Sequence, residues 1–476
     1  MGGGAAATSD PRATDVAIDV LRSGGNAVDA ALAAALVLYV VEPHYCGLGG
    51  DAFLLVDRGD GRPQALDGAG AVPAALTAEN LARDGLDTVP VRGVRSATVP
   101  GAADLVVTAL ERFGTWSRGA IARPAIDIAR SGFEVRPTLE IAAARTADAI
   151  ASDPVLGPIY VPGGTPAKVG DTIVNELLAV ALEQLVDGGS DRFYRGPTAE
   201  AIANMVARDG GYLSVADLAD HRTTDVTAEH ADFLDATIWQ FPAPTQGPSV
   251  LRALERLVGS TALEPPIDWA EVLEATHAGM RDAGFDPAAV GAHRRRSGRG
   301  DTTYLAVADD SDMVVSLITS VFGEFGSGVG VAELGGPLHN RATTYLMVDR
   351  PLAPGKPPHT TIPGMVTRAN GDSLAVGVAG GMLQPQVQVQ ILVHVLAEGA
   401  GIQEAIDAPR FKILFGGSPA LENGHPLGTE MPDAIERAGQ PAGYGAAQVA
   451  GRWEGHHVAG ADARRNGAAM VFDAAT

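Results

Sequence analysis

The chain contains a single cysteine, Cys46, among its 476 residues. One thiol cannot form a disulfide within the chain, and it cannot build a metal site that needs several cysteines. Because Cys46 stands among apolar residues and glycines, we expect a buried structural thiol rather than a reactive one. The sequence also has no His-Glu-x-x-His, phosphate-loop or Gly-x-Ser-x-Gly motif, so it carries no signature of a zinc protease, a phosphate-loop nucleotide enzyme or a serine hydrolase.

Basic residues are also scarce. There are 35 lysines and arginines against 57 acidic residues, which gives a net charge of −22. Nucleic acids and anionic membrane surfaces are bound by basic patches, so we expect neither as a partner and assign the acidity to solubility. The longest apolar run, residues 30–41, is short of the ~20 residues that span a bilayer. Residues 1–4 lack the basic and apolar segments of a secretory signal, which predicts either a cytoplasmic protein or a sequence given without its leader.

The hydrophobic fraction of 46% is ample for a large core. Caps and apolar spacing predict helices at residues 11–22 and from residue 26, then at 101–113, 121–131, 138–151, 174–186, 197–208, 387–398 and 402–408. Strands are predicted at 53–57, 236–241, 343–348 and 374–378, and a hairpin at 300–320. These elements predict an α+β fold. No long linker rich in Pro, Gly or Ser divides the chain, so we expect one interlocked unit.

The hairpin begins with an acid and two hydroxyl residues, Asp301-Thr302-Thr303, directly after a basic segment at residues 294–299. We interpret the basic segment as a solvated, protease-accessible loop. If the peptide bond before Thr302 is cut, the Thr302 hydroxyl becomes a nucleophile and its own α-amine becomes the base. An α-amine titrates near ~8, which is close to the working pH. The same residues also fit a surface hairpin whose threonines serve strand propensity.

Motifs along nearly the whole chain resemble those of the γ-glutamyltranspeptidase family, whose members are N-terminal-nucleophile hydrolases that cleave themselves before a Thr. The motifs are Gly24-Gly25-Asn26-Ala27-Val28-Asp29-Ala30-Ala31, Gly47-Leu48-Gly49-Gly50, Gly210-Gly211-Tyr212-Leu213 with Asp217-Leu218, Asp301-Thr302-Thr303, Phe325-Gly326-Ser327-Gly328, Gly380-Gly381, Ala408-Pro409-Arg410-Phe411 and Asp462-Ala463-Arg464-Arg465-Asn466-Gly467. Each motif alone is weak, but their number and order indicate the family.

The resemblance implies a four-layer αββα sandwich, in which helices cover both outer faces of two central antiparallel sheets. It implies cleavage between Asp301 and Thr302 of a zymogen into a large segment, 1–301, and a small segment, 302–476. The two processed chains would stay associated, and a homodimer of such heterodimers is a candidate assembly. The resemblance implies a small-molecule substrate and neither a cofactor nor a metal.

The resemblance also assigns catalytic roles. Thr302 is the expected nucleophile, and Ser320, eighteen positions on, is expected to orient its amine or hydroxyl. The backbone N–H groups of Gly380 and Gly381 match the family's oxyanion hole. Two alternatives stay open: Ser320 also fits a strand serine that faces water, and the glycine pair also fits a tight turn after a strand.

Five positions are candidate substrate contacts. His359 and Thr360 stand where typical members contact the bound substrate, and Phe322 stands where they carry an Asn. Asn340 and Arg341 belong to a segment closer to the acylase-like branch of the family, as does the segment at residues 382–386. Arg341 is a candidate for binding a substrate carboxylate, and an internal salt bridge is its alternative. His359 fits a structural role equally well.

Both halves of the family's γ-glutamyl clamp are missing. Transpeptidases bind the glutamyl carboxylate with an Arg, but the matching residues 67–73 contain no Arg. They bind the glutamyl amine with acidic residues, but residues 339–344 contain no acid. A zwitterion without charged partners is costly to bury. We therefore expect poor activity on glutathione.

The leading hypothesis is an autoprocessed Thr-nucleophile hydrolase or acyltransferase that cleaves an amide of a small acyl or modified amino-acid substrate. One alternative is a biosynthetic member that breaks another acyl-type bond, even carbon–carbon, in a natural-product pathway. A second alternative is a catalytically inert binding homologue. The intact Asp301-Thr302, Ser320 and Gly380-Gly381 set favours an enzyme.

Overall fold

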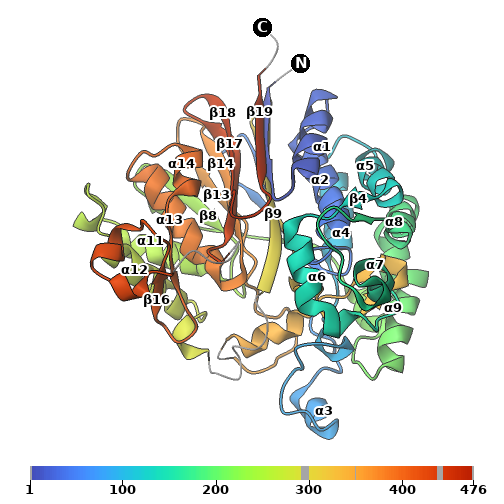
Figure 1. Cartoon of the computed structure of the whole chain (residues 1–476). Coiled ribbons are helices and arrows are strands. Elements are labelled where there is room, and N and C mark those ends of the chain that lie inside the picture. The colour runs from blue at the N-terminus through green and yellow to red at the C-terminus, as the bar shows by residue number, and fades with distance from the viewer. Residues whose placement is uncertain (1–2, 291–299, 349, 437–442, 474–476) are drawn as a thin grey trace.

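The computed structural model describes residues 3–290, 300–348, 350–436 and 443–473, and the side chain of Asp301 lies outside the described set. Two antiparallel sheets form the centre of the molecule (Figure 1). The first has the order β19-β1-β9-β10-β2-β3-β6, and the second has the order β18-β17-β14-β13-β8-β7. Shorter pairings join β4 with β5, β11 with β12, and β15 with β16.

The strands of the first sheet are β1 (Gly4–Thr8), β2 (Asp51–Arg58), β3 (Gln64–Asp67), β6 (Thr224–Val226), β9 (Gly300–Asp309), β10 (Met313–Gly323) and β19 (Ala468–Phe472). Those of the second are β7 (Glu229–Phe233), β8 (Ala236–Gln240), β13 (Gly364–Thr367), β14 (Ser373–Ala379), β17 (Ala446–Trp453) and β18 (His456–Ala461). The short strands are β4 (Phe133–Glu134), β5 (Thr172–Ile173), β11 (Gly330–Val331), β12 (Gly336–Pro337), β15 (Phe411–Ile413) and β16 (Pro419–Leu421).

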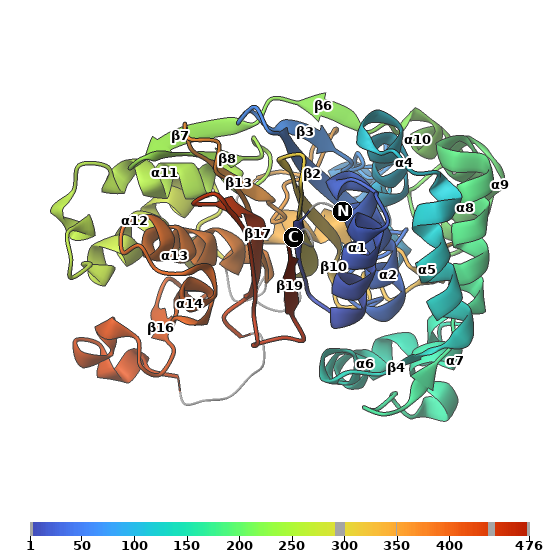
Figure 2. The same cartoon turned by 90° about the horizontal axis from the view of Figure 1, so that it is seen from above.

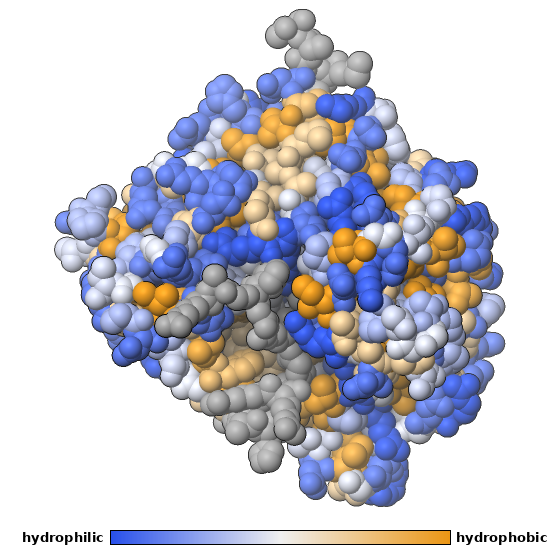
Figure 3. All heavy atoms as spheres, in the orientation of Figure 1, coloured by the Kyte–Doolittle hydropathy of each residue, from blue (hydrophilic) through white to orange (hydrophobic). Residues whose placement is uncertain are grey.

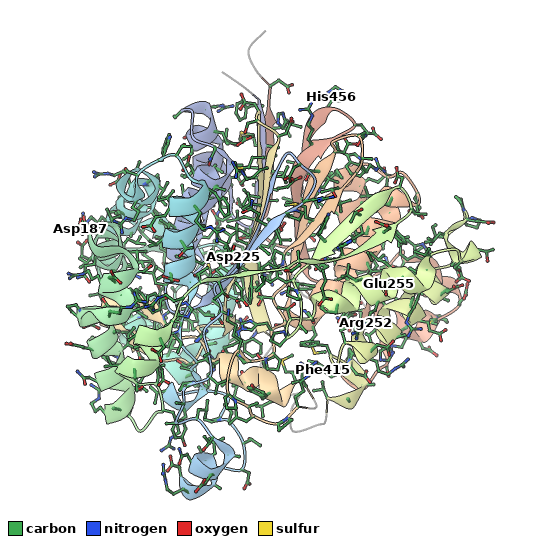
Figure 4. The ribbon with its side chains drawn as sticks, turned by 180° about the vertical axis from the view of Figure 1, so that it is seen from behind. Asp187, Asp225, Arg252, Glu255, Phe415 and His456 are labelled. Carbon is green, nitrogen blue, oxygen red and sulfur yellow. The ribbon has the colours of Figure 1, made fainter. Side chains whose placement is uncertain are left out.

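Helices cover the outer side of each sheet (Figure 2). Beside the first sheet lie α1 (Pro11–Arg22), α2 (Ala27–Val41), α4 (Ala102–Phe113), α5 (Arg118–Ser131), α8 (Glu176–Arg195) and α9 (Pro197–Arg208), with α6 (Pro137–Ile150), α7 (Leu156–Tyr160) and α10 (Val215–Asp220) toward the edges. The short helix α3 (Ala78–Arg83) lies at the bottom of the view in Figure 1. Beside the second sheet lie α11 (Gly247–Leu257), α12 (Trp269–Asp282), α13 (Gln384–Leu396) and α14 (Ile402–Asp407). From behind, Asp187 on α8 and Glu255 on α11 mark the two opposite helical sides (Figure 4).

Helix α2 packs directly against the strands that carry the predicted nucleophile. Every residue of α2 is buried, and it contacts both β9 and β10. A helix that is apolar all round belongs in a core, and its alanines let neighbouring backbone approach closely. Its start is fixed by a capping box, in which Asn26 accepts from the N–H of Asp29 and the Asp29 carboxylate accepts from the N–H of Asn26.

The two sheets pack face to face through small residues and a few aromatics. Strand β9 contacts β14 and β17 of the opposite sheet. The Tyr304 ring lies over Gly377, where a Cβ would come 2.2 Å from the ring, so only glycine fits there. The Tyr304 hydroxyl also shares a 2.7 Å hydrogen bond with Ser316 on β10. These contacts fix β9, and with it Thr302, against the second sheet.

The predicted α+β class, the hairpin at 300–320 and the buried Cys46 are confirmed. The predicted strand at 343–348 is wrong, because residues Arg341–Leu346 form a 3-10 helix, η7. The hydroxyls of Thr343 and Thr344 donate to the carbonyls of Asn340 and Arg341, at 2.6 and 2.9 Å. Such side-chain bonds offer the backbone an alternative to a strand, which overrides the β propensity of threonine.

The face seen in Figure 3 is largely hydrophilic between small apolar patches, as a net charge of −22 leads one to expect. In the parts of the chain that the structure covers, no helix is both long and apolar enough to cross a bilayer.

Candidate active site

Thr302 lies near the start of β9 and is 2% exposed. Its Oγ1 atom is 3.4 Å from Oγ of Ser320 on the neighbouring strand β10. The ladder pairs Thr303 with Thr319 and Asp301 with Phe322, so a bulge places Ser320 and Val321 opposite Thr302. Bulges re-aim side chains, and this one puts the Ser320 hydroxyl beside the predicted nucleophile.

The bulge is held by a hydrogen bond from the backbone N–H of Phe322 to Ser320 Oγ, at 2.9 Å. Phe322 has φ +73°, a conformation that bulky residues rarely adopt. Strain of this kind collects at functional sites. The structure therefore favours the site role of Ser320 over the alternative of a strand serine that faces water, because Ser320 is 1% exposed.

Two residues that the sequence analysis did not single out also contact Thr302. Gln384, at the start of α13, places Nε2 3.5 Å from Thr302 Oγ1, while its Oε1 accepts from the N–H of Ile362 at 2.9 Å. Arg465 donates from Nη1 to the carbonyl oxygen of Thr302 at 3.2 Å and stacks on Tyr45. Both belong to segments that carried the family resemblance, but a motif does not show which member reaches the nucleophile.

Gly380 and Gly381 follow β14 directly and have φ values of +139° and +60°. Both values favour glycine, so the turn needs both residues. The turn leads into the 3-10 helix η8 (Gly381–Leu383), which contacts β9. Nε2 of Gln246 donates to the carbonyls of both Gly381 and Thr360, and so ties this turn to the segment around His359. The turn and the oxyanion role are compatible, since the turn leads into η8 beside β9.

A buried cluster of charged and polar side chains lies on the other side of Ser320. Asp51 is paired with Ser320 in the register of β2 and β10. Its Oδ2 atom accepts from Nε of Arg341 and lies against Nδ1 of His339, both at 3.0 Å, and Nε2 of His359 is 4.0 Å away. Burial alone would raise the pKa of Asp51, but His339, His359 and Arg341 hold that pKa well below its ordinary value.

Arg341 is fully buried, and its Nη1 and Nη2 atoms have no hydrogen-bond partner within the described part of the chain. Burial lowers its pKa, although Asp51 acts in the opposite direction. Its guanidinium carbon lies 4.7 Å from the centre of the Phe322 ring. The internal salt bridge considered for Arg341 is therefore present. It uses only Nε, and it leaves Nη1 and Nη2, at the outer edge of the guanidinium, without a partner among the described residues.

The other candidate substrate contacts differ in how far they are already engaged. Asn340 donates from Nδ2 to the carbonyl of Val91 and accepts at Oδ1 from the N–H of Gly323, which favours a supporting role for it. His359 shares a 3.2 Å contact between Nδ1 and Thr361 and stacks edge-on against Phe53. Burial lowers the pKa of His359 well below its ordinary value, and the charge of Arg341 acts in the same direction.

A second buried network adjoins Thr302 on the side of α2. Oε2 of Glu42 accepts from the hydroxyls of Thr303 and Ser9, at 2.7 and 2.6 Å. Burial raises the pKa of Glu42 to about 7, in spite of both hydroxyl donors. Glu42 is thus hydrogen-bonded to Thr303, the residue that follows Thr302. The isolated sequence Val41-Glu42-Pro43 gave no signal for this contact.

No group of three or more His, Cys, Asp or Glu side chains is arranged to hold a metal within the described ranges. The chemistry available at the site is that of hydroxyls, amides, backbone N–H groups, buried carboxylates and the guanidinium groups of Arg341 and Arg465. Such a set serves nucleophilic acyl transfer.

Comparisons with known proteins agree with this geometry. The family model described as gamma-glutamyltranspeptidase matches residues 13–294 and 271–472. The chain is 31% identical to the oxamate amidohydrolase proenzyme of Klebsiella pneumoniae over 84% of this chain and 83% of that one. It is 29% identical to the acylase ACY 1 proenzyme of a Pseudomonas strain, SE83, over 91% of this chain and 86% of that one.

A solved structure extends the match to the fold. The cephalosporin acylase from Bacillus halodurans superposes with a TM-score of 0.89 at 30% identity, and the match covers 98% of this chain and 96% of that one. The family model and the Klebsiella relative each cover most of the sequence. The chain therefore belongs to the γ-glutamyltranspeptidase family of N-terminal-nucleophile hydrolases, which are made as self-processing proenzymes.

Proposed function

We propose that this protein is an autoprocessed threonine hydrolase that cleaves an amide bond of a small acyl or modified amino-acid substrate. The observation that carries the proposal is the setting of Thr302, whose hydroxyl lies 3.4 Å from Ser320 and 3.5 Å from Gln384. We further propose that its layers form the αββα sandwich of four layers, because the two sheets contact each other and helices contact their outer faces.

In the first step, Oγ1 of Thr302 attacks the carbonyl carbon of Asp301. The bond between that carbon and the Thr302 nitrogen breaks, the nitrogen gains a proton, and an ester to Oγ1 forms. Water then hydrolyses the ester and leaves a carboxyl end on segment 1–301 and a free amine on segment 302–476. The two segments stay interlocked, since the β9–β10 hairpin of the second segment lies between β1 and β2 of the first.

In the catalytic cycle, the free α-amine of Thr302 accepts the proton of Oγ1 as that oxygen attacks the substrate amide. The N–H groups of Gly380 and Gly381 stabilise the oxyanion, and Ser320 and Gln384 hold the hydroxyl in place. The amine product leaves with the proton, and an acyl ester remains on Thr302. Water completes hydrolysis, whereas an acceptor amine completes transfer.

The surroundings support a substrate other than a γ-glutamyl compound. The hydroxyls of Thr343 and Thr344 donate to backbone carbonyls of η7 and its cap, and residues 67–73 supply no arginine. The relatives at comparable identity include an oxamate amidohydrolase and acylases. Oxamate is a small amide with a carboxylate and no ammonium, which matches a site that keeps Arg341 and lacks an acid clamp.

The deciding experiment compares purified wild type with Thr302→Ala for chain size and for release of amine from a panel of N-acyl amides. We expect two chains and turnover from wild type, and one chain without turnover from the variant. Turnover by an uncut wild-type chain would refute the mechanism. Complete cleavage without turnover of any acyl amide would favour the biosynthetic alternative, and an uncut chain without turnover would favour the inert one.

A further inference from the structure

Cleavage before Thr302 turns a position inside a buried strand into the end of a chain. In the uncut chain, residues 300–301 pair with residues 322–323 of β10. The ladder resumes where Thr303 pairs with Thr319, and Thr302 lies at the bulge between these pairs. Chain ends fray unless other contacts tie them down. Once residues 300–301 no longer continue into Thr302, its amine and hydroxyl depend on contacts from outside the β9–β10 ladder.

Arg465 supplies one such contact. Its Nη1 atom donates to the carbonyl oxygen of Thr302 at 3.2 Å. Arg465 is buried, and its guanidinium carbon lies 4.6 Å from the centre of the Tyr45 ring, so this long side chain has little freedom to move. A charge-assisted hydrogen bond to the carbonyl fixes the peptide plane between Thr302 and Thr303. It therefore fixes the Cα atom that carries the amine and the hydroxyl of Thr302.

Glu42 supplies a second contact, one residue further along β9. Its Oε2 atom accepts from the hydroxyl of Thr303 at 2.7 Å and from that of Ser9 at 2.6 Å. Glu42 is the C-cap of α2, a helix in which every residue is buried, so a rigid element presents its carboxyl group. Burial raises the pKa of Glu42, and the positive charge of Arg465 acts in the opposite direction. The two side chains thus hold adjacent residues of β9, and their opposite charges attract each other.

The loop that follows Glu42 also holds the bulge of β10. The carbonyl of Tyr45 accepts from the N–H of Val321 at 2.8 Å, and Val321 lies in the bulge opposite Thr302. The same Tyr45 places its ring against Arg465. The loop belongs to segment 1–301 and Arg465 belongs to segment 302–476, so both segments hold the new chain end. None of these contacts uses the residues before Thr302, so cleavage there breaks none of them.

On the basis of the proposed function, we propose that Arg465 and Glu42 are positioning residues, which keep the amine and the hydroxyl of Thr302 in place after the peptide bond before it is cut. Before cleavage, the chain on both sides of Thr302 holds it, so self-cleavage needs these contacts less. Loss of either contact should therefore slow turnover more than self-cleavage. The loss should act on kcat rather than on KM, because both side chains act through the nucleophile.

The first measurement compares kcat and KM of processed enzyme on an N-acyl anilide with the half-time of self-cleavage on a denaturing gel. Arg465→Met should lower kcat by about 10- to 100-fold, with KM and the half-time within about threefold of wild type. Arg465→Lys should keep part of kcat, because it keeps a cationic donor. Glu42→Met should lower kcat by about 3- to 10-fold, and Glu42→Gln, which keeps an acceptor oxygen, should restore it. An uncut Arg465→Met chain, or a rise in KM at unchanged kcat, would overturn the inference. Arg465→Lys and the Glu42 pair carry the same comparison if Arg465→Met does not fold.

A second measurement does not need turnover. Periodate splits the Cα–Cβ bond of an N-terminal threonine, whose amine and hydroxyl are on adjacent carbons, and is itself reduced to iodate. Threonines inside a chain do not react, so the mass of the smaller chain reports Thr302 alone. Thr302 is 2% exposed, and a chain end that is held in place should react slowly. Processed Arg465→Met should react about tenfold faster than processed wild type, because its chain end opens more often.

Arg368→Met is the matched control, because Arg368 also stacks on an aromatic ring and pairs with aspartates, but it precedes β14 whereas Gly380 follows that strand. It should lower the Tm as Arg465→Met does and leave kcat and the periodate rate near those of wild type. Equal effects in the two arginine variants would reveal a general loss of stability and overturn the inference. Faster oxidation of Arg465→Met, beside a cut wild type that hydrolyses no anilide, would refute the proposed function and keep the positioning role. Hydrolysis by wild type, with kcat and the oxidation rate unchanged in Arg465→Met, would do the reverse.

Discussion

The side-chain amide of Gln384 joins Thr302 to the segment that contains Ile362. Nε2 of Gln384 lies 3.5 Å from Oγ1 of Thr302, and Oε1 accepts the N–H of Ile362 at 2.9 Å. One helical turn later, Gln388 donates to the carbonyl of the same Ile362 at 3.0 Å, and its Oε1 accepts from Gln240. Both glutamines are buried on α13 and bond to Ile362, but only Gln384 is close to Thr302.

This difference predicts distinct effects of two matched substitutions. Gln384→Ala should lower kcat by about 3- to 10-fold, the value of one neutral hydrogen bond, with a smaller change in KM. Both substitutions should lower the Tm by similar amounts, but Gln388→Ala should leave kcat near that of wild type. Steady-state kinetics and thermal unfolding of both processed variants provide the measurement. Equal kcat losses in the two would show that Gln384 only supports the fold.

The fold was largely predictable because local rules and tertiary packing agree in most elements. The hairpin of β9 and β10 and the capped start of α2 follow from turn formers and an Asn cap. Thr343 and Thr344 show where prediction fails, because hydroxyl bonds to Asn340 and Arg341 turn a strand-like sequence into η7.

The site was predictable only in part. Thr302, Ser320 and the glycine pair follow from motifs. The contacts of Gln384 with Thr302, of Glu42 with Thr303 and of Asp51 with Arg341 join residues 82 to 290 positions apart, and no local pattern in a single sequence encodes such pairs.

Self-cleavage is the most direct expectation. Purified wild type should split between Asp301 and Thr302, and N-terminal sequencing of the smaller chain should begin Thr-Thr-Tyr. Thr302→Ala should remain one chain without activity, whereas Thr302→Ser should retain some of both, because the step requires only the hydroxyl. A denaturing gel followed over time gives the measurement. Cleavage in Thr302→Ala would move the nucleophile, with Thr303 the first residue to test.

The raised pKa of Glu42 predicts that the stability of the fold decreases as the pH rises. Burial raises its folded-state pKa from 4.5 to about 7, so between these values the folded protein keeps a proton that the unfolded chain has lost. The free energy of unfolding should therefore fall as the pH rises from 4.5 to 7, by roughly 3 kcal/mol at most from this group. Glu42→Gln should flatten that part of the profile. Denaturant unfolding of both proteins across this range measures the difference, and parallel profiles would contradict the assignment.

The last prediction concerns the ammonium group of a γ-glutamyl substrate. γ-Glutamyl and glutaryl anilides differ only by that ammonium, so their comparison isolates its effect at the site. We expect Arg341, whose Nη1 and Nη2 atoms have no described partner, to bind the carboxylate of either compound. Thr343 and Thr344 have no charge for the ammonium and already donate to the η7 backbone. An ammonium that loses water without a charged partner costs ~1.5–3 kcal/mol, so processed enzyme should favour the glutaryl compound by about 10- to 100-fold in kcat/KM. The glutathione rate should be correspondingly low. Equal rates on both anilides would mean that a carboxylate outside the η7 segment accepts the ammonium, and the clamp would then have moved rather than disappeared.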